Sequence, residues 1–417
     1  MGELYELFNQ HPRISTDTRR IEPGSIFFAL RGDTFDGNRF VAEALDKGAA
    51  CAVADDPKVT AACGRQRVLL VDDTLKALQE LARRHRRALG IPILAISGSN
   101  GKTTTKEFVS RVLAERFAVY ATRGNLNNHI GVPLTLLAMT RDTEFGVVEM
   151  GASACGELSL LASIAEPNYG MLTNIGLAHL EGFGGPEGVR RGKGELFDFL
   201  AANAGRAFVP SDDKILTEMA AERTPLAAEY YAASLADGFE HHLEGSYNRF
   251  NIAAAVAVGR FFAIPDEDIR RAIAGYIPDN NRSQRIATPR NTLVADCYNA
   301  NPSSMRASVG NFLAEPLEGH RRRMLILGDM LELGDWSERE HAAVIAMAAR
   351  DPEAEVLLVG AEFARACAGL AEKPANVTLC PTRDELISRL RRSPVEQALV
   401  LIKGSRGMGL EQVLEEL

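Results

Sequence analysis

The segment Gly98–Thr105 carries the clearest chemical signal in this sequence. It reads Gly-Ser-Asn-Gly-Lys-Thr-Thr-Thr, between the apolar run Ile93–Ser97 and a segment with helical periodicity. A strand, a glycine loop and a helix in this order favour phosphate binding, because N–H groups at a helix start and the helix dipole attract anions. The loop is shorter than the common form, since Ile96 replaces the usual first glycine. The residues predicted to hold a nucleoside triphosphate are Gly98, Ser99, Asn100, Gly101, Lys102, Thr103 and Thr104.

Two further residues stand where metal ligands are expected. Glu149 lies at the end of the apolar strand Phe145–Met150, and His179 follows the strand Gly170–Ile175. Side chains at the carboxyl ends of parallel strands face the ligand crevice. Glu149 and a hydroxyl of Thr103 suit Mg²⁺, whereas an imidazole suits Mn²⁺ better. The alternatives are an ordinary acid at a strand end and a structural histidine.

Three stretches of the chain have different patterns of elements. Residues 1–90 contain short strands and a helix over Thr74–Leu89, whereas residues 91–288 and 289–417 alternate buried strands with helices. Such alternation is typical of parallel sheets between helices. We predict an α/β protein with three domains at these boundaries: a small N-terminal α/β domain, a central parallel-sheet domain with the phosphate loop, and a Rossmann-like, doubly wound C-terminal domain.

The composition is that of an ordinary globular protein. Of the 417 residues, 46% are apolar and 24% are charged, which excludes a largely disordered or fibrous chain. The apolar runs are far shorter than the ~20 residues of a membrane helix, and no secretory signal opens the chain. The net charge of −8 argues against a nucleic-acid partner, so we interpret the basic run Arg83–Arg87 as a solvated helix end. We expect a cytoplasmic monomer with free thiols.

Together these motifs resemble those of the ATP-dependent Mur ligases. The matching segments span nearly the whole chain and are Gly98–Thr105, Glu149–Ala152, Thr173–His179, Gly192–Phe197, Gly245–Asn251 and Asp296–Pro302. The segments Ser15–Arg19, Phe27–Gly32, Asp296–Pro302 and Gly328–Gly334 favour one branch of the family. Members of this branch join D-alanyl-D-alanine (D-Ala-D-Ala) to UDP-N-acetylmuramoyl-tripeptide, a cytoplasmic step of peptidoglycan precursor synthesis.

The resemblance implies an amide ligase that works through an acyl phosphate. The peptide carboxylate would attack the γ-phosphoryl group of ATP, and the amine of D-Ala-D-Ala would then displace phosphate. The implied cofactors are ATP and two Mg²⁺ ions. Another Mur-type ligase and a ligase like folylpolyglutamate synthase are the nearest alternatives. A switch protein or ATPase with a phosphate loop is a more distant one, because it would not need the motifs around His179 and Lys193.

The resemblance also implies roles for individual residues. Lys102, His179, Lys193 and Arg282 would be catalytic, and CO₂ would carbamylate Lys193, because a cation beside two metal ions is unfavourable. The implied metal ligands are Thr103, Glu149, His179 and Lys193. The implied further nucleotide contacts are Asn248, Asn251, Arg282 and Asp296. The implied substrate contacts are Ser15, Thr16, Asp17, Thr18, Arg19 and Asn38 for the UDP-sugar, Asn125, Asn127 and Asn128 for the muramoyl peptide, and Asn299, Asn301, Ser303 and Lys403 for D-Ala-D-Ala.

Simpler roles compete with several of these assignments. Asn248 could cap a helix, and the asparagines at 125, 127 and 128 could form turns. Lys193 could be an ordinary lysine at a helix start, and Lys403 could belong to a flexible tail. The chain also departs from the family pattern in two places. Asn38 stands where the family usually has histidine, and Asp279–Ser283 replaces the usual Pro-Gly-Arg form around Arg282.

Overall fold

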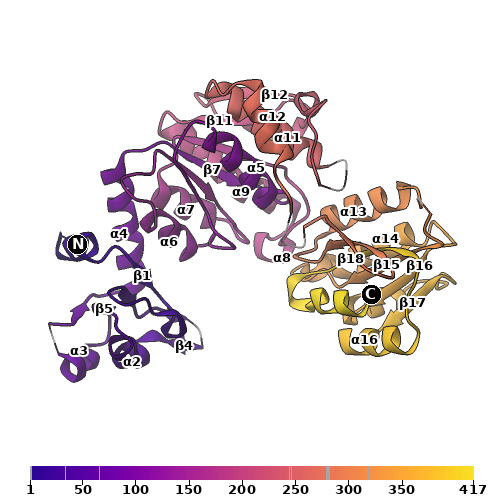
Figure 1. The fold of residues 1–417 in the computed structure, drawn as a ribbon, viewed down its shortest axis with the longest axis horizontal. Coiled ribbons are helices and arrows are strands. Elements are labelled where there is room, and N and C mark those ends of the chain that lie inside the picture. Colours follow the sequence, from indigo (N-terminus) through magenta and orange to yellow (C-terminus); the bar gives the residue numbers. More distant parts are fainter. Residues whose placement is uncertain are drawn as a thin grey trace.

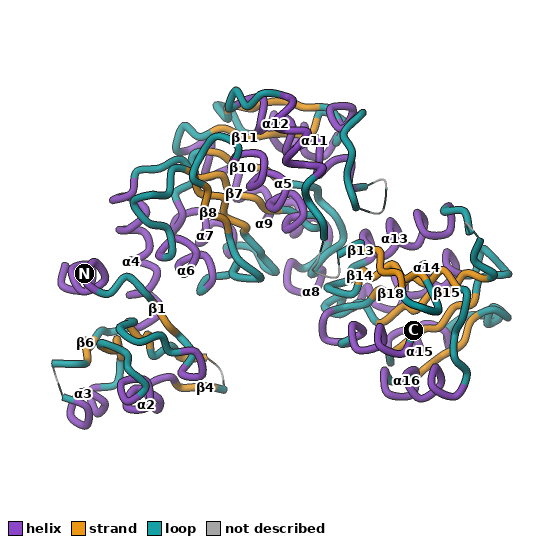
Figure 2. Tube along the Cα trace, in the orientation of Figure 1, coloured by secondary structure: helices purple, strands orange, loops and turns teal. Residues whose placement is uncertain are grey.

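The computed structural model describes residues 2–32, 34–64, 66–243, 245, 247–278, 282–317 and 319–417. Three main sheets follow one another along the chain, and helices cover them (Figure 1). Figure 2 shows the strands gathered in three separate regions, with the N-terminal and C-terminal sheets at opposite ends of the molecule. The predicted α/β class with three domains is confirmed, whereas the predicted boundary positions stay a prediction.

The first sheet is small and parallel, with the strand order β1-β2-β5-β6. Its strands are β1 (Ile14–Ser15), β2 (Ile26–Phe28), β5 (Cys51–Ala54) and β6 (Val68–Leu70), and a hairpin of β3 (Arg31–Gly32) and β4 (Phe35–Asp36) follows β2. The helices of this part are α1 (Gly2–Gln10), α2 (Val41–Asp46) and α3 (Pro57–Cys63). All residues of β2 and β5 are buried, which explains their uninterrupted apolar runs.

Helix α4 (Thr74–Leu89) connects the first sheet to the second. It begins where the Asp73 side chain accepts a hydrogen bond from the Lys76 N–H, and it ends at Gly90, whose φ is +64°. The helix packs against α6 (Gly131–Leu137) and α7 (Glu157–Ala165) of the central part (Figure 1). Arg86 is buried there and donates to the carbonyl oxygens of Ala165 and Glu166. A solvated helix end is therefore the wrong interpretation for Arg86.

The central sheet is parallel throughout, with the order β12-β11-β10-β7-β9-β8. Its strands are β7 (Ile93–Ser97), β8 (Val119–Ala121), β9 (Phe145–Glu149), β10 (Tyr169–Leu172), β11 (Arg206–Pro210) and β12 (Ala227–Tyr231). The helices are α5 (Lys102–Ala114), α6 (Gly131–Leu137), α7 (Glu157–Ala165), α8 (Leu180–Phe183), α9 (Pro186–Ala202), α10 (Lys214–Ala221), α11 (Asn248–Phe261) and α12 (Asp266–Ala274). Along β7, Leu94 and Ile96 pack with α5 and α11, whereas Ile93 and Ala95 belong to the core on the opposite face. Helices thus bury both faces of the sheet.

The C-terminal sheet has the order β13-β14-β18-β15-β16-β17, and only β13 is antiparallel to its neighbour. The strands are β13 (Gln284–Ala287), β14 (Thr292–Asp296), β15 (Arg322–Gly328), β16 (Glu355–Val359), β17 (Val377–Cys380) and β18 (Ala398–Lys403). The helices are α13 (Pro302–Ala314), α14 (Ser337–Ala348), α15 (Ala361–Ala368) and α16 (Arg383–Arg392). β13 lies before residue 288, the predicted end of the central domain, yet it pairs with β14 of the C-terminal sheet.

Among the described residues, no helix combines the length and apolar character needed to cross a membrane.

Candidate active site

A cavity of about 1160 Å³ lies between the central and C-terminal sheets. The loops after β7, β9 and β10 form one side, and the loops after β14, β15 and β18 form the other. The carboxyl ends of parallel strands therefore meet at this cavity, as is usual for ligand sites in open α/β sheets. The predicted site residues that line it are Ser99, Asn100, Gly101, Lys102, Thr103, Thr104, Asn125, Asn127, Asn128, Glu149, His179, Asn248, Asn251, Arg282, Asp296, Asn299, Asn301, Ser303 and Lys403.

The phosphate loop connects β7 to α5, in the predicted order of strand, loop and helix. The end of β10 fixes its shape. The N–H of Asn100 donates to Oδ1 of Asn174 (3.1 Å), and its carbonyl oxygen accepts from Nδ2 of Asn174 (3.0 Å) and Oγ1 of Thr173 (2.5 Å). Gly98 has a φ of +133° beside Thr173. A backbone with this conformation and this close approach requires glycine.

Lys102 is the first residue of α5, and its ammonium group lies inside the phosphate loop. Nζ donates to the carbonyl oxygens of Gly98 (2.8 Å) and Ser99 (3.2 Å). Burial lowers the pKa of Lys102 to about 8, with Glu149 opposing the shift and Arg282 adding to it. An anion in this loop would favour the charged ammonium, so the arrangement suits a phosphate group.

Glu149 ends β9 and is 2% exposed. Oε1 accepts a hydrogen bond from Nδ2 of Asn127 (2.8 Å), whereas Oε2 has no hydrogen-bond partner among the described residues. A buried carboxylate oxygen without a partner costs free energy. Mg²⁺ binds such oxygens, and it commonly uses one or two carboxylates together with substrate phosphates. Glu149 and the buried hydroxyl of Thr103 therefore fit one Mg²⁺ ion beside the phosphate loop.

His179 precedes α8 and has a φ of +52°. Its Nδ1 contacts Oε2 of Glu332, which lies in the loop after β15 and therefore comes from the other side of the cavity. This contact lowers the pKa of Glu332. In the described part of the chain, no group of three or more His, Cys, Asp or Glu side chains is arranged as a metal site. A metal at His179 would need further ligands from substrate or from a modified residue.

Lys193 lies on α9, 1% exposed and behind the cavity wall. Its Nζ donates to the carbonyl oxygen of Ala152 (2.8 Å) and lies 5.2 Å from the centre of the Phe183 ring. Burial holds the pKa of Lys193 well below 10.5, the nearby charge of Lys102 adds to this shift, and Glu157 and Glu195 oppose it. The site therefore shifts the protonation equilibrium of Lys193 towards the neutral amine.

The two asparagines at the start of α11 hold this helix against the phosphate loop. Nδ2 of Asn251 donates to Oδ1 of Asn248 (2.7 Å), and Oδ1 of Asn251 accepts from the hydroxyl of Thr105 (3.0 Å). A Cβ on Gly101 would lie 2.6 Å from Oδ1 of Asn251. Both asparagines also line the cavity, so their position is compatible with a nucleotide contact.

Asp296 and Lys403 lie side by side at the carboxyl ends of β14 and β18. Their charged atoms are 2.6 Å apart, and Lys403 is 2% exposed. Oδ1 of Asp296 also accepts from the N–H of Ser283 (3.3 Å), next to Arg282. The charge of Lys403 is thus already paired within the protein. Asp279–Asn281, which depart from the family pattern before Arg282, lie outside the described residues.

Asn301 connects the C-terminal domain to the phosphate loop, and Ser303 connects it to the loop after β10. Oδ1 of Asn301 caps α13 by accepting from the N–H of Ser304 (2.9 Å), while its Nδ2 donates to Oδ1 of Asn100 (2.7 Å). The hydroxyl of Ser303 accepts from the N–H of Leu177 (2.8 Å). Both residues line the cavity, and the contacts that they make are contacts between domains.

The loop around residues 125–128 lines the cavity on the central side. Its asparagines differ in their surroundings. Asn125 is exposed, Asn127 holds Glu149, and Oδ1 of Asn128 accepts from the N–H groups of Ile130 (3.1 Å) and Gly131 (2.8 Å) at the start of α6. Asn128 therefore makes the turn that was the alternative to a substrate contact.

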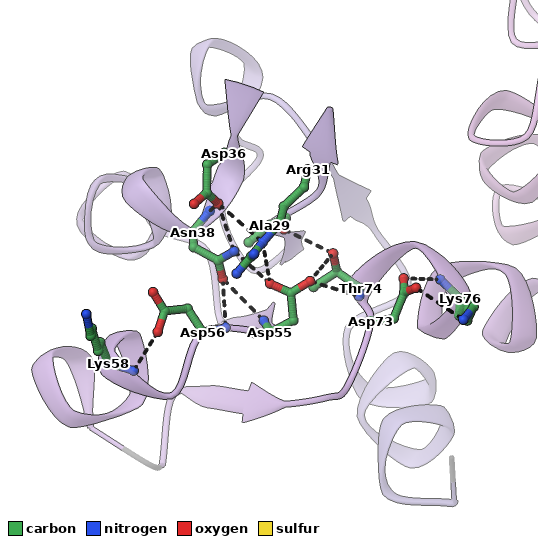
Figure 3. Close-up of polar contacts among 10 residues, drawn as sticks. All are labelled: Ala29, Arg31, Asp36, Asn38, Asp55, Asp56, Lys58, Asp73, Thr74 and Lys76. Atoms are coloured by element: carbon green, nitrogen blue, oxygen red, sulfur yellow. Dashed lines mark hydrogen bonds and ion pairs between the residues drawn. The ribbon is translucent and has the colours of Figure 1, made fainter. Parts of the chain in front are cut away.

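The residues predicted to meet the UDP-sugar lie in the N-terminal domain, outside this cavity. Asp17 caps the short helix Thr18–Arg20, and its hydrogen bonds with Arg19 lower the pKa of Asp17 to about 2. Asn38 is buried, and Figure 3 shows its amide between two aspartates. Nδ2 donates to Asp36 and Asp55 (both 2.8 Å), and Oδ1 accepts from the N–H groups of Asp55 and Asp56. The geometry gives Asn38 a role in holding this loop.

Three family models match successive parts of the chain. They are described as the Mur ligase family catalytic domain (residues 12–86), the Mur ligase middle domain (residues 96–241) and the Mur ligase glutamate ligase domain (residues 281–406). A curated relative from Bacillus subtilis, named UDP-N-acetylmuramoyl-tripeptide–D-alanyl-D-alanine ligase, is 35% identical over 97% of this chain and 92% of its own length. The chain belongs to the Mur ligase family.

Other proteins and solved structures are also similar to this chain. The Escherichia coli protein of the same name is 33% identical over 100% of this chain and 96% of its own length. A crystal structure of MurF from Acinetobacter baumannii superposes with a TM-score of 0.85 at 30% identity, covering 97% of this chain and 93% of that one. A folylpolyglutamate synthase from Mycobacterium tuberculosis shares the fold, with a TM-score of 0.62 at 15% identity over 82% of this chain and 94% of that one.

The structure adds two cavity residues, Tyr298 and Glu332, that sequence reasoning did not assign to the site. The guanidinium carbon of Arg282 lies 3.7 Å from the centre of the Tyr298 ring, and that of Arg406 lies 5.2 Å from the same centre. Glu332 reaches His179 across the cavity. The motifs Asp296–Pro302 and Gly328–Gly334 contain Tyr298 and Glu332, so a signal was present, but their contacts depend on how the domains meet.

Proposed function

We propose that this chain joins D-Ala-D-Ala to UDP-N-acetylmuramoyl-tripeptide, with ATP converted to ADP and phosphate. The observation that carries this proposal is the cavity in which the phosphate loop of the central domain faces the C-terminal domain. A ligase must bring an activated carboxylate and an amine together, and a cavity shared by two domains can hold both. The curated relatives over the full length of the chain bear the name of this activity.

The first step brings two anions together. The substrate carboxylate oxygen would attack the γ-phosphorus of ATP, the bond from that phosphorus to the bridging oxygen of ADP would break, and an acyl phosphate would form. Lys102 and the N–H groups of the phosphate loop would offset the negative charge of the transferred group. Arg282, near Lys102, would add a second cation. The amine of D-Ala-D-Ala would then attack the acyl carbon, phosphate would leave, and the amine would lose a proton.

Magnesium is proposed at two positions. Glu149 and Thr103 would hold the ion nearest the phosphates. The buried Oε2 of Glu149, which has no partner in the described part of the chain, supports this position. A second ion would use His179 and Lys193 in its carbamylated form. When bound, Mg²⁺ would neutralise phosphate oxygens and polarise the phosphoryl group. The proposed nucleotide contacts beyond the phosphate loop are Asn248, Asn251 and Asp296, the first two beside α5 and the last beside Arg282.

The remaining substrate contacts are proposed by position. Ser15–Arg19 would meet the UDP-sugar from the N-terminal domain, and the loop of residues 125–128 would meet the muramoyl peptide. Asn299, Asn301, Ser303 and Lys403 lie on the C-terminal side of the cavity, where the amine substrate would enter. We also propose a cytoplasmic monomer whose domains divide near residues 90 and 288.

An assay of ADP release tests the function directly. We expect ADP to form over multiple turnovers only when UDP-N-acetylmuramoyl-tripeptide and D-Ala-D-Ala are both present, and not with folate and glutamate. Tripeptides with lysine or meso-diaminopimelate as third residue would identify the preferred acceptor. ATP turnover that does not depend on an amine substrate would contradict the proposal and favour an ATPase.

Lys193 provides a second test. Carbamylation requires the neutral amine, whose nitrogen attacks the carbon of CO₂ and then loses a proton, and burial favours this form. We expect Lys193→Ala to lower kcat by about 100-fold or more, with partial rescue by short carboxylic acids. Wild-type protein in ¹³C-labelled bicarbonate should give a carbamate carbon signal that the variant lacks. Full activity of the variant, or no carbamate signal in the wild type, would contradict this role.

A further inference from the structure

Five lysine and arginine side chains line the described part of the cavity, and they differ in their partners. Lys102 lies in the phosphate loop, Lys403 pairs with Asp296, and Lys214 lies 3.8 Å from Glu218. Arg282 is close enough to affect the pKa of Lys102, which places it at the phosphate end. Arg406 is the remaining one. It belongs to the C-terminal domain, it is exposed, and no carboxylate of the described residues pairs with it.

The ring of Tyr298 holds Arg406 in place. Nη1 of Arg406 donates to the Tyr298 hydroxyl (3.3 Å), and its guanidinium carbon lies 5.2 Å from the ring centre. Arg282 contacts the same ring at 3.7 Å. Cations are attracted to an aromatic ring, but two guanidinium groups at one ring repel each other. An anion bound beside them would relieve that repulsion.

The backbone before Arg406 is also fixed. The N–H of Ser405 donates to the carbonyl oxygen of Asp329 (3.1 Å), and its hydroxyl accepts from the N–H of Leu331 (2.9 Å) and donates to the carbonyl oxygen of Ala300 (3.3 Å). Arg406 therefore extends from an anchored loop into the cavity. A guanidinium group has five N–H donors, and only one of them donates to Tyr298, so a planar fork remains for a ligand.

We propose that Arg406 binds the free carboxylate of the incoming amine substrate, and that Tyr298 is the residue that positions it. This inference rests on the proposed function, in which that substrate is D-Ala-D-Ala. The terminal carboxylate is the only anionic group of the dipeptide, and arginine matches a carboxylate with two parallel hydrogen bonds. Lys403 is buried and already paired with Asp296, so Arg406 is the C-terminal cation that remains for this group.

Steady-state kinetics of Arg406 variants give the first test. We expect Arg406→Ala to raise KM for D-Ala-D-Ala by about 10- to 100-fold, as the loss of charge-assisted hydrogen bonds predicts. KM for ATP and for the UDP-linked substrate should change less than about 2-fold. Arg406→Lys should be intermediate, because it keeps the charge without the fork. Arg392→Ala is the control, since this exposed arginine on α16 bonds only within its own helix among the described residues.

A substrate without the carboxylate gives the decisive test. D-alanyl-D-alaninamide keeps the attacking amine but lacks the negative charge. Wild-type protein should prefer the acid over the amide by about 10- to 100-fold in kcat/KM, and Arg406→Ala should reduce this preference to near unity. An unchanged preference in the variant, or an equal rise in KM for ATP, would overturn the inference. If wild-type protein releases no ADP with the acid dipeptide, the proposed function itself fails instead.

Variants of Tyr298 separate positioning from direct binding. Tyr298→Phe keeps the ring and removes the hydroxyl, so KM for the dipeptide should rise only a few-fold. Tyr298→Ala should raise it about as much as Arg406→Ala, and the two substitutions together should do little more than either alone. Fully additive effects would show that Tyr298 acts independently of Arg406 and would overturn its positioning role.

Discussion

Gly98 leaves no room for a side chain beside the phosphate loop. A Cβ at this position would lie 2.1 Å from Oγ1 of Thr173 and 2.8 Å from the Thr173 backbone nitrogen. Gly98→Ala must therefore shift either the loop or the end of β10, and both shape the phosphate site. We expect a loss of ATP affinity of about 10- to 100-fold, which isothermal titration calorimetry would measure.

Gly90 is a matched control for this substitution. Its φ of +64° is also left-handed, but a Cβ there would meet no atom within 4 Å. Gly90→Ala should cost about 1 kcal/mol of unfolding free energy through the backbone conformation alone, and leave ATP affinity unchanged. An equal loss of affinity in both variants would mean that strain, and not the contact with Thr173, explains the effect of Gly98→Ala.

At the scale of residues, the sequence predicted the positions that depend only on neighbouring residues in the chain. Spacing alone placed Lys102 at a helix start, and strand patterns placed Glu149 at a strand end. The pairing of Asp296 with Lys403 joins residues 107 positions apart and depends on β14 and β18 being neighbours. Such contacts follow from sheet order, which one sequence does not specify.

Among the elements, α4 joins two domains through its arginines. Arg86 donates to the carbonyl oxygens of Ala165 (2.8 Å) and Glu166 (3.0 Å) and to Oδ1 of Asn168 (2.9 Å). We expect Arg86→Ala to lower the unfolding free energy by about 2–4 kcal/mol, because these partly buried acceptors lose their donor. Denaturant unfolding followed by circular dichroism would measure the change.

Arg87 is the control for Arg86. It is the next residue of the same helix, and it pairs with the Glu166 carboxylate at the surface. Exposed ion pairs contribute about 0–1 kcal/mol, so Arg87→Ala should have little effect on stability. Similar losses in the two variants would contradict the role of Arg86 in holding α4 against the central domain.

Strongly apolar strands were the elements that sequence patterns predicted best. The strand Ile93–Ser97 has the predicted bounds, and so does helix Thr74–Leu89. The strands β8, β11 and β12 were not predicted. β8 and β12 are the edges of the central sheet, where no second neighbour demands a continuous apolar sequence. The edges of the central sheet therefore carry a weak signal.

For the whole molecule, the decisive property is how the C-terminal domain meets the phosphate loop. Asn301 donates to Asn100, Ser303 accepts from Leu177, and Glu332 contacts His179. These contacts link the two walls of one cavity. The position of the C-terminal domain and the state of the phosphate loop are therefore physically connected, and domain closure during catalysis would have to rearrange them.

Asn301 allows the domain contact to be separated from helix stability. Asn301→Ser keeps an oxygen that can cap α13 but is too short to reach Asn100, whereas Asn301→Ala loses both functions. We expect only the alanine variant to lose about 1 kcal/mol of unfolding free energy. Both variants should broaden the distribution of distances between a spin label on the central domain and one on the C-terminal domain. Double electron–electron resonance without nucleotide would measure this distribution. If the serine variant keeps the wild-type distribution, the bond to Asn100 does not orient the C-terminal domain, and the contacts of Ser303 and Glu332 must be sufficient.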